Sequence, residues 1–137
     1  MRAVIDTNVL VYDTFGDSAF HGEARALLES LEEWSIPTIV MNEYVWLLRA
    51  IGVSAGDALE KVKEYLLHPK GRLICEEVGD AIRSLQMISS EGLSLSRFND
   101  ALILMMATRI KSPIASFDAK LRGQAIGRGL AVLPEGI

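Results

Sequence analysis

The chain has 137 residues and a formal net charge of −4, and half of its residues are hydrophobic while 23% are charged. Such a length and composition are typical of one globular domain and exclude a disordered chain. No apolar run approaches the roughly 20 residues of a membrane span, no targeting peptide precedes the first strand, and the single cysteine excludes an internal disulfide. We therefore expect one cytoplasmic domain over residues 1–137, with no membrane partner.

The negative charge argues weakly against a non-specific nucleic-acid coat, because proteins of that kind are usually basic. If four carboxylates are committed to a metal site, however, the remaining 14 acidic residues equal the 14 basic residues in number. The charge balance therefore does not exclude a nucleic-acid substrate.

Strand and helix patterns alternate along the chain. Short apolar and β-branched runs predict five strands, at residues 2–5, 36–39, 72–75, 114–117 and 130–133. Apolar residues at helical spacing predict helices at residues 19–34, 40–51, 54–67, 78–91, 97–110 and 118–126. The alternation predicts an α/β fold: a three-layer α/β/α sandwich around a central, mainly parallel sheet of about five strands.

Local signals refine several of these helices. Asp17-Ser18, Ser54 and Ser96 are expected to provide N-caps for the helices that follow them. In the helix over residues 78–91, the spacing of Ile82, Leu85 and Ile88 predicts that all three face inward. The helix over residues 97–110 is apolar on every side between residues 102 and 107, which is typical of a helix packed deeply against a sheet.

Four acidic residues stand where this topology brings separate segments together. Asp6 ends the first strand, Glu43 lies one turn into the helix after the second, Asp100 lies in the first turn of the apolar helix, and Asp118 follows the fourth strand. Ligands of open α/β sheets gather at this edge of the sheet. Carboxylates crowded together repel one another unless cations intervene. An oxygen-only ligand set suits Mg²⁺ or Mn²⁺.

Each acid also has an ordinary structural interpretation. Asp118 could act only as an N-cap, worth about 0.5–2 kcal/mol, and Asp100 could only complement a helix dipole, worth about 0.3–1 kcal/mol. Asp6 could be a turn residue and Glu43 a surface residue. The position of Glu43 beside an apolar stripe favours function, because an unpaired carboxylate there costs several kcal/mol.

Four segments together resemble the successive motifs of the PIN-domain nucleases. They are Val4-Ile5-Asp6-Thr7-Asn8-Val9-Leu10, Asn42-Glu43-Tyr44, Phe98-Asn99-Asp100-Ala101-Leu102-Ile103 and Ser116-Phe117-Asp118. Within that family the compact chain is similar to the VapC-type toxins. The resemblance implies that Asp6, Glu43, Asp100 and Asp118 are metal ligands and catalytic residues. It also implies supporting roles for Thr7, Asn8 and Ser116.

The resemblance further implies a metal-dependent endoribonuclease, which would leave a 5′-phosphate and a 3′-hydroxyl. Its expected cofactor is Mg²⁺ or Mn²⁺, and its expected partners are an RNA substrate, a second copy of the chain in a homodimer, and a small antitoxin. An alternative is a PIN-like module that binds RNA or metal without turnover. A phosphatase that uses Asp6 as nucleophile is disfavoured, because Asn8 stands where the second aspartate of such enzymes would be. No fifth acid accompanies Asp118, which leaves the number of metal ions open.

The remaining candidates carry weaker signals. Arg97, close to Asp100 in sequence, is the best candidate among the cations for contact with RNA phosphate. The other cations considered are Arg49, Lys111, Lys120 and Arg122. We expect His21 and His68 to have surface or capping roles. Tyr44 and Trp46 are expected to be core or interface residues in preference to platforms for base stacking.

Overall fold

The computed structural model describes all residues from 1 to 137 and contains one parallel sheet of five strands. The strands are β1 (Arg2–Ile5), β2 (Glu33–Pro37), β3 (Gly71–Ile74), β4 (Ile114–Ala115) and β5 (Val132–Leu133). Their order across the sheet is β3-β2-β1-β4-β5, and every neighbouring pair is parallel. The predicted α/β fold with five parallel strands is confirmed.

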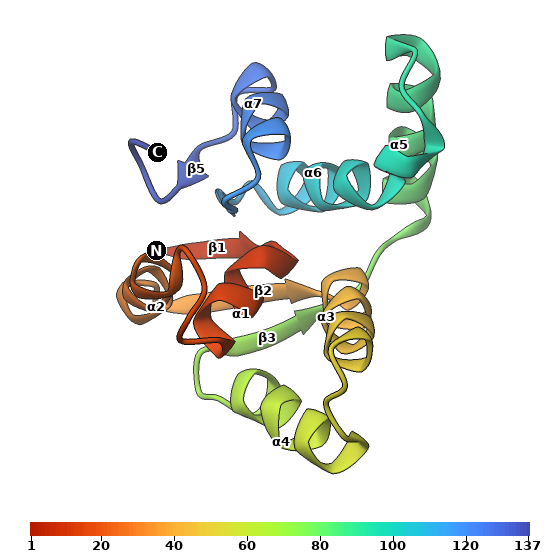
Figure 1. The fold of residues 1–137 in the computed structure, drawn as a ribbon. Helices are drawn as coiled ribbons and strands as arrows, with labels where there is room; N and C mark the ends of the chain where they lie inside the picture. The colour runs from red at the N-terminus through yellow and green to blue at the C-terminus, as the bar shows by residue number, and fades with distance from the viewer.

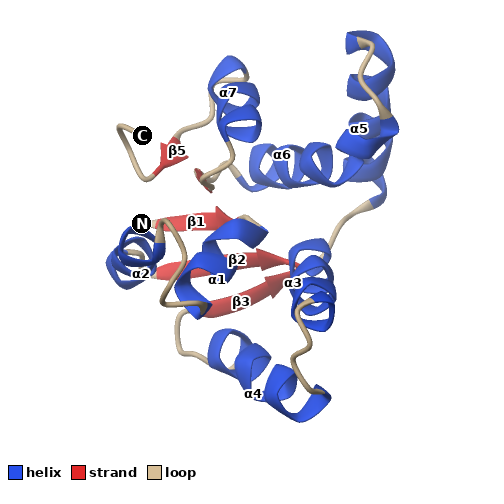
Figure 2. Ribbon diagram, viewed as in Figure 1, coloured by secondary structure: helices blue, strands red, loops and turns tan.

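Seven α-helices and one short 3₁₀-helix connect the strands (Figures 1 and 2). The α-helices are α1 (Thr7–Thr14), α2 (His21–Ser30), α3 (Thr38–Ala50), α4 (Ala55–Leu66), α5 (Val78–Glu91), α6 (Phe98–Ile110) and α7 (Ala119–Gly127), and the 3₁₀-helix spans Leu95–Arg97. No helix is both long enough and apolar enough to cross a membrane.

The chain moves from β1 outward to β2 and β3, and then returns to β4 and β5 on the other side of β1. Because parallel crossovers are right-handed, the two halves of the chain place their helices on opposite faces of the sheet. Helices α1 to α4 accordingly contact one another, as do helices α5 to α7. Figure 1 shows the two groups apart, with α1 to α4 in the lower part of the view and α5 to α7 above.

The core is centred on β1 and α6. Ala3, Val4 and Ile5 are fully buried, and every residue from 101 to 107 of α6 is buried, as the apolar run predicts. A strand buried on both faces cannot accommodate a charge within its length. Asp6 is therefore positioned where β1 ends and the chain reaches the edge of the sheet.

Several predictions for the first half of the chain are wrong, including the strand over residues 36–39, since β2 ends at Pro37 and α3 begins at Thr38. The sequence pattern gave no helix at residues 7–14, yet α1 begins directly after Asp6, which caps it. The helix expected over residues 19–34 is limited to α2, since β2 begins at Glu33 and pairs with both β1 and β3. Ser18 does not cap α2; its hydroxyl donates to the carbonyl oxygens of residues 12 and 15 instead.

Helix α5 has the predicted bounds but a different buried face. Ile82 and Leu85 are 51% and 45% exposed, which contradicts the expected inward stripe, while Ile88 is buried as expected. The helix instead buries Asp80 completely, and this carboxylate pairs with Arg109 of α6 at 3.0 Å. An ion pair of this kind fixes the rotation of α5 about its axis in a way that apolar spacing does not reveal.

Candidate active site

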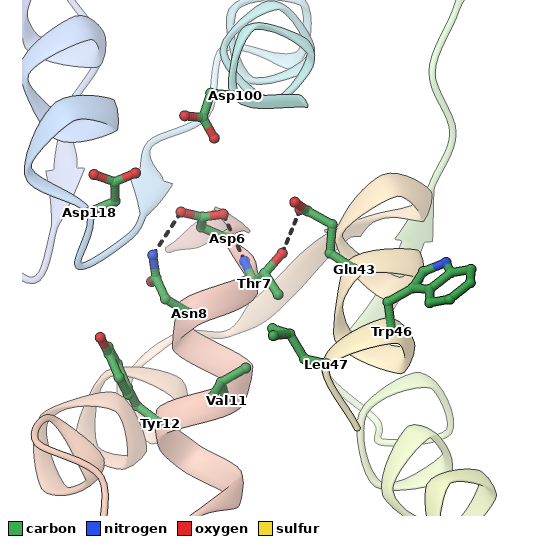
Figure 3. A pocket seen from close by; sticks show the side chains of 10 residues that line it. All are labelled: Asp6, Thr7, Asn8, Val11, Tyr12, Glu43, Trp46, Leu47, Asp100 and Asp118. Atoms are coloured by element: carbon green, nitrogen blue, oxygen red, sulfur yellow. Dashed lines mark hydrogen bonds between the residues drawn. The ribbon is translucent and has the colours of Figure 1, made fainter. Parts of the chain in front are cut away.

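The candidate site lies at the carboxyl ends of β1 and β4. These strands are neighbours from which the chain departs in opposite directions, and such a switch point is the usual ligand crevice of an open α/β sheet. A pocket of about 640 Å³ opens here. Its lining consists of Asp6, Thr7, Asn8, Val11, Tyr12, Glu43, Trp46, Leu47, Asp100 and Asp118 (Figure 3). All four predicted acids therefore line one pocket.

Asp6 is the most buried of the four acids, with 6% of its surface exposed. Its Oδ1 accepts a hydrogen bond from the backbone N–H of Thr7 at 2.8 Å, and its Oδ2 accepts from Ser116 Oγ at 2.7 Å and Asn8 Nδ2 at 3.0 Å. Burial raises the pKa of Asp6 from 3.8 to about 6 against the opposing effect of the hydrogen bonds from Ser116 and Thr7, with smaller contributions from the negative charges of Asp100 and Glu43. The site thus holds a carboxylate that lacks a positive partner.

Asn8 and Ser116 connect the ends of β1 and β4. Asn8 Nδ2 also donates to Ser116 Oγ at 3.3 Å, and Asn8 Oδ1 accepts from the backbone N–H of Phe117 at 3.0 Å. Ser116 Oγ in turn accepts from the backbone N–H of Asp118 at 3.1 Å. Both residues therefore fix the orientation of Asp6, and an aspartate at position 8 could not donate these bonds.

Glu43 is held from two sides. Thr7 Oγ1 donates to Glu43 Oε1 at 2.8 Å, and Asn99 Nδ2 donates to Glu43 Oε2 at 3.4 Å. Asn99 was not predicted as a site residue. Its position beside Asp100 in the first turn of α6 was the one feature of the sequence that could have indicated this role. The contacts bring together α1, α3 and α6, and Figure 3 shows the Glu43 carboxylate pointing from α3 toward Asp6.

Asp100 and Asp118 complete the acidic lining. Asp100 forms an ion pair with Arg97 at 3.0 Å, and Arg97 also donates to the side chain of Gln124. Burial raises the pKa of Asp100; Arg97 opposes this, while the negative charges of Asp118 and Glu43 add to it. Asp118 caps α7 by accepting from the backbone N–H of Lys120 at 3.0 Å, so its capping role and its place in the pocket coexist.

The chemistry of the donors fits a hard divalent cation. The site offers carboxylate oxygens from four segments, and the burial that raises the pKa of Asp6 and Asp100 would be offset by positive charge. As arranged, no three His, Cys, Asp or Glu side chains converge closely enough to hold an ion. Asp6, Glu43, Asp100 and Asp118 are the carboxylates of the pocket that could offer oxygen atoms to such an ion.

The other residues considered from the sequence do not contribute acidic groups to the pocket. Arg122 is buried and donates to the carbonyl oxygens of residues 116 and 134, so it is unavailable to a phosphate. The ring nitrogens of the two histidines hydrogen-bond only to backbone groups, at residues 12 and 70, and the His68 ring packs against Trp34 with the ring centroids 4.3 Å apart. Tyr44 is fully buried, as expected, but Trp46 is 63% exposed and is not part of the core.

The fold and the acidic pocket define an α/β protein with a carboxylate site at its topological switch point. The sequence model of the PIN domain matches residues 3–126, and the chain belongs to the PIN-domain family. No curated protein matches the chain.

Several solved structures share the fold. VapC20 of Mycobacterium tuberculosis, a toxin that cleaves the sarcin-ricin loop, aligns with a TM-score of 0.76 at 16% identity, over 89% of this chain and 94% of that one. VapBC2 of Rickettsia felis, bound to a DNA fragment from its promoter, aligns with a TM-score of 0.69 at 17% identity, over 96% and 97%. A toxin–antitoxin complex from Klebsiella pneumoniae gives 0.67 at 20% identity, over 96% and 95%. At these identities the similarity establishes the shared fold.

Proposed function

We propose that the protein is a metal-dependent endoribonuclease, acting as one nuclease domain over residues 1–137. The observation that carries the proposal is that four carboxylates, one from each PIN-type motif, line a single pocket in which Asp6 is buried with no Lys or Arg side chain paired to it. Similarity in fold to a toxin that cleaves the sarcin-ricin loop supports RNA as the substrate class.

The residues of the chain would share the work of hydrolysis. A bound Mg²⁺ or Mn²⁺ would supply charge stabilisation at the phosphate and a water of lowered pKa. Asp6, Glu43, Asp100 and Asp118 would hold the cation. Asn8, Ser116 and Thr7 would orient the carboxylates, as their hydrogen bonds to Asp6 and Glu43 indicate. Arg97 would position the Asp100 carboxylate through their ion pair.

The test is a cleavage assay on structured RNA with Mg²⁺ or Mn²⁺, comparing the natural chain with Asp100→Asn. We expect metal-dependent cleavage that EDTA abolishes and that falls by more than about 100-fold in Asp100→Asn, because even residues behind the ligands typically contribute 10- to 100-fold. The matched control is Glu60→Gln on α4, an exposed acid outside the pocket lining, which should cleave normally.

Circular dichroism must show that both variants fold. Equal cleavage by the natural chain and Asp100→Asn, or cleavage that survives EDTA, would overturn the mechanism. Metal-dependent RNA binding without any cleavage would support the alternative of a non-catalytic PIN-like module.

We also propose that the chain is the toxin of a VapBC-type pair and forms a homodimer. The support is the similarity in fold to VapBC2 and to a toxin–antitoxin complex, together with the exposed apolar side chains of Val78, Ile82 and Leu85 along α5. The pairing would be supported by a neighbouring gene that encodes a small DNA-binding protein, provided that this protein co-purifies with the chain and blocks its cleavage of RNA. A monomer in light scattering would contradict the homodimer.

A further inference from the structure

Trp46 has an unusual environment for a tryptophan. It is 63% exposed, although it lies on α3 less than one turn after Glu43 and borders the acidic pocket. Figure 3 shows its indole on the outer side of α3, turned away from α1, while Leu47 points toward α1. A large aromatic ring in this position forgoes most of the stabilisation that burial would provide. The ring is therefore exposed to solvent at the border of the pocket.

Arg49 supports this ring. Its guanidinium carbon lies 5.0 Å from the centroid of the Trp46 ring, one helical turn further along α3. No carboxylate lies within ion-pair distance of Arg49 anywhere in the structure. The pair thus presents an aromatic face and an uncompensated positive charge at the same place.

The charges around the pocket make this pair distinctive. Four carboxylates line the pocket. A polyanionic RNA strand that extends beyond these acids needs cationic side chains to bind its phosphates. Arg97 is engaged by Asp100, and Arg122 is buried against carbonyl oxygens. Arg49 follows Glu43 by six residues on α3, Lys120 follows Asp118 by two residues, and neither cation forms an ion pair.

We propose that Trp46 and Arg49 form a nucleobase-stacking subsite for a nucleotide next to the scissile phosphate. The proposal rests on the endoribonuclease function proposed above. An aromatic face combined with arginine is the usual means of holding single-stranded nucleic acid without reading its sequence. Trp46 lines the same pocket as Glu43 and follows it by three residues on α3, so we place the stacked base on a nucleotide next to the one at the acids.

The proposal specifies the substrate class. A base can stack on an indole only after it has left its own helical stack, so the substrate is RNA that is unpaired or looped at the cleavage position. A continuous RNA duplex would not use this subsite.

The test uses tryptophan fluorescence in the Asp100→Asn background with Mg²⁺, where the RNA stays intact. A short unpaired RNA oligonucleotide is titrated into the protein, and then the same oligonucleotide annealed to its complement. The second tryptophan, Trp34, is buried and donates to a carbonyl oxygen, so it serves as an internal reference. We expect the unpaired RNA to quench the emission, Trp46→Phe to abolish the quenching while binding persists, and the duplex to have little effect.

Binding and kinetics provide the second measurement. Trp46→Ala should weaken binding of unpaired RNA by about 5- to 150-fold, the range for removal of one stacking aromatic side chain. In the active chain it should raise KM more than it lowers kcat. Arg49→Lys should keep the salt dependence of binding, whereas Arg49→Ala should reduce it. Val45→Ala is the matched control, because Val45 is an exposed apolar residue of the same helix outside the pocket lining.

Three outcomes overturn the proposal. Unchanged RNA binding in Trp46→Ala, with cleavage that still depends on Asp100, would remove the stacking subsite and leave the nuclease intact. A change of oligomeric state in Trp46→Ala without any change in RNA affinity would assign the ring to a protein interface. Absence of both RNA binding and cleavage in the natural chain would overturn the proposed function together with the subsite.

Discussion

Burial gives Asp6 a titration that separates it from an ordinary aspartate. Its two oxygens accept three hydrogen bonds, which favour the charged form, yet the loss of solvent has the larger effect and raises its pKa to about 6. A carboxyl group in this condition gains most from an added cation. The same burial that makes Asp6 costly in the free protein therefore suits it to be the central metal ligand.

A dependence of stability on pH follows for the metal-free protein. Between pH 4 and 6 the folded state binds a proton at Asp6 that the unfolded state has released, so the free energy of unfolding falls as pH rises through this window. The cost reaches about 3 kcal/mol above pH 6, and it is absent below pH 4. Urea denaturation in EDTA should show this fall in the natural chain relative to Asp6→Asn, which has no carboxyl to titrate. A difference between the two chains that is constant from pH 4 to 7 would contradict the assignment.

Single residues show which parts of this site could be predicted from the sequence alone. Asp6, Asp100 and Asp118 were predictable because each follows a strand or begins a helix, and such positions converge in a parallel sheet. Asn99 was not, because its contact with Glu43 depends on how α6 approaches α3, and no local pattern encodes that approach. Trp46 was expected in the core or an interface, and only the packed structure shows how much of its ring is exposed.

Among the elements, α1 and α5 show why periodicity failed where it did. Helix α1 is short and has apolar residues on several sides, so its spacing gave no helical signal, and its start depends on Asp6 as N-cap. In α5 the apolar stripe is clear but faces solvent, because a buried carboxylate determines the orientation of the helix. Asp80 accepts from Arg109 and from the backbone N–H of Glu77. Burial by itself raises the pKa of Asp80. The hydrogen bonds and charges of Arg109, Glu77 and Arg83 have the larger combined effect, so the pKa of Asp80 is lowered.

The ion pair between α5 and α6 predicts a stability effect remote from the pocket. Asp80→Asn should reduce the free energy of unfolding by about 2–3 kcal/mol, the value for charged hydrogen bonds to a buried carboxylate when the partner stays partly solvated. Urea denaturation at pH 7 measures the loss. Glu60→Gln, which removes an exposed pair on α4, should change stability by less than about 0.5 kcal/mol. Equal effects of the two substitutions would show that the buried ion pair contributes no more to the free energy of unfolding than the exposed one.

At the scale of the whole molecule, the site joins the two halves of the fold. Asp6 and Glu43 come from the half that contains α1 to α4, whereas Asp100 and Asp118 come from the half that contains α5 to α7. Figure 1 shows the two groups of helices on either side of β1, and the pocket lies where they meet. Neither half can form the site alone. A ligand that contacts all four acids therefore binds only the fully folded chain.

Metal binding should therefore stabilise the entire domain. At a Mn²⁺ or Mg²⁺ concentration of 100 times Kd the gain is about 2.7 kcal/mol, which for a domain of this size raises Tm by about 10 °C. Differential scanning calorimetry with and without the metal measures this shift independently of cleavage. Asp100→Asn should lose most of the shift, while Glu60→Gln should keep it, because only the former removes a carboxylate of the pocket. If Asp100→Asn and the natural chain gain the same Tm, the cation binds elsewhere and the four acids do not act together as its ligands.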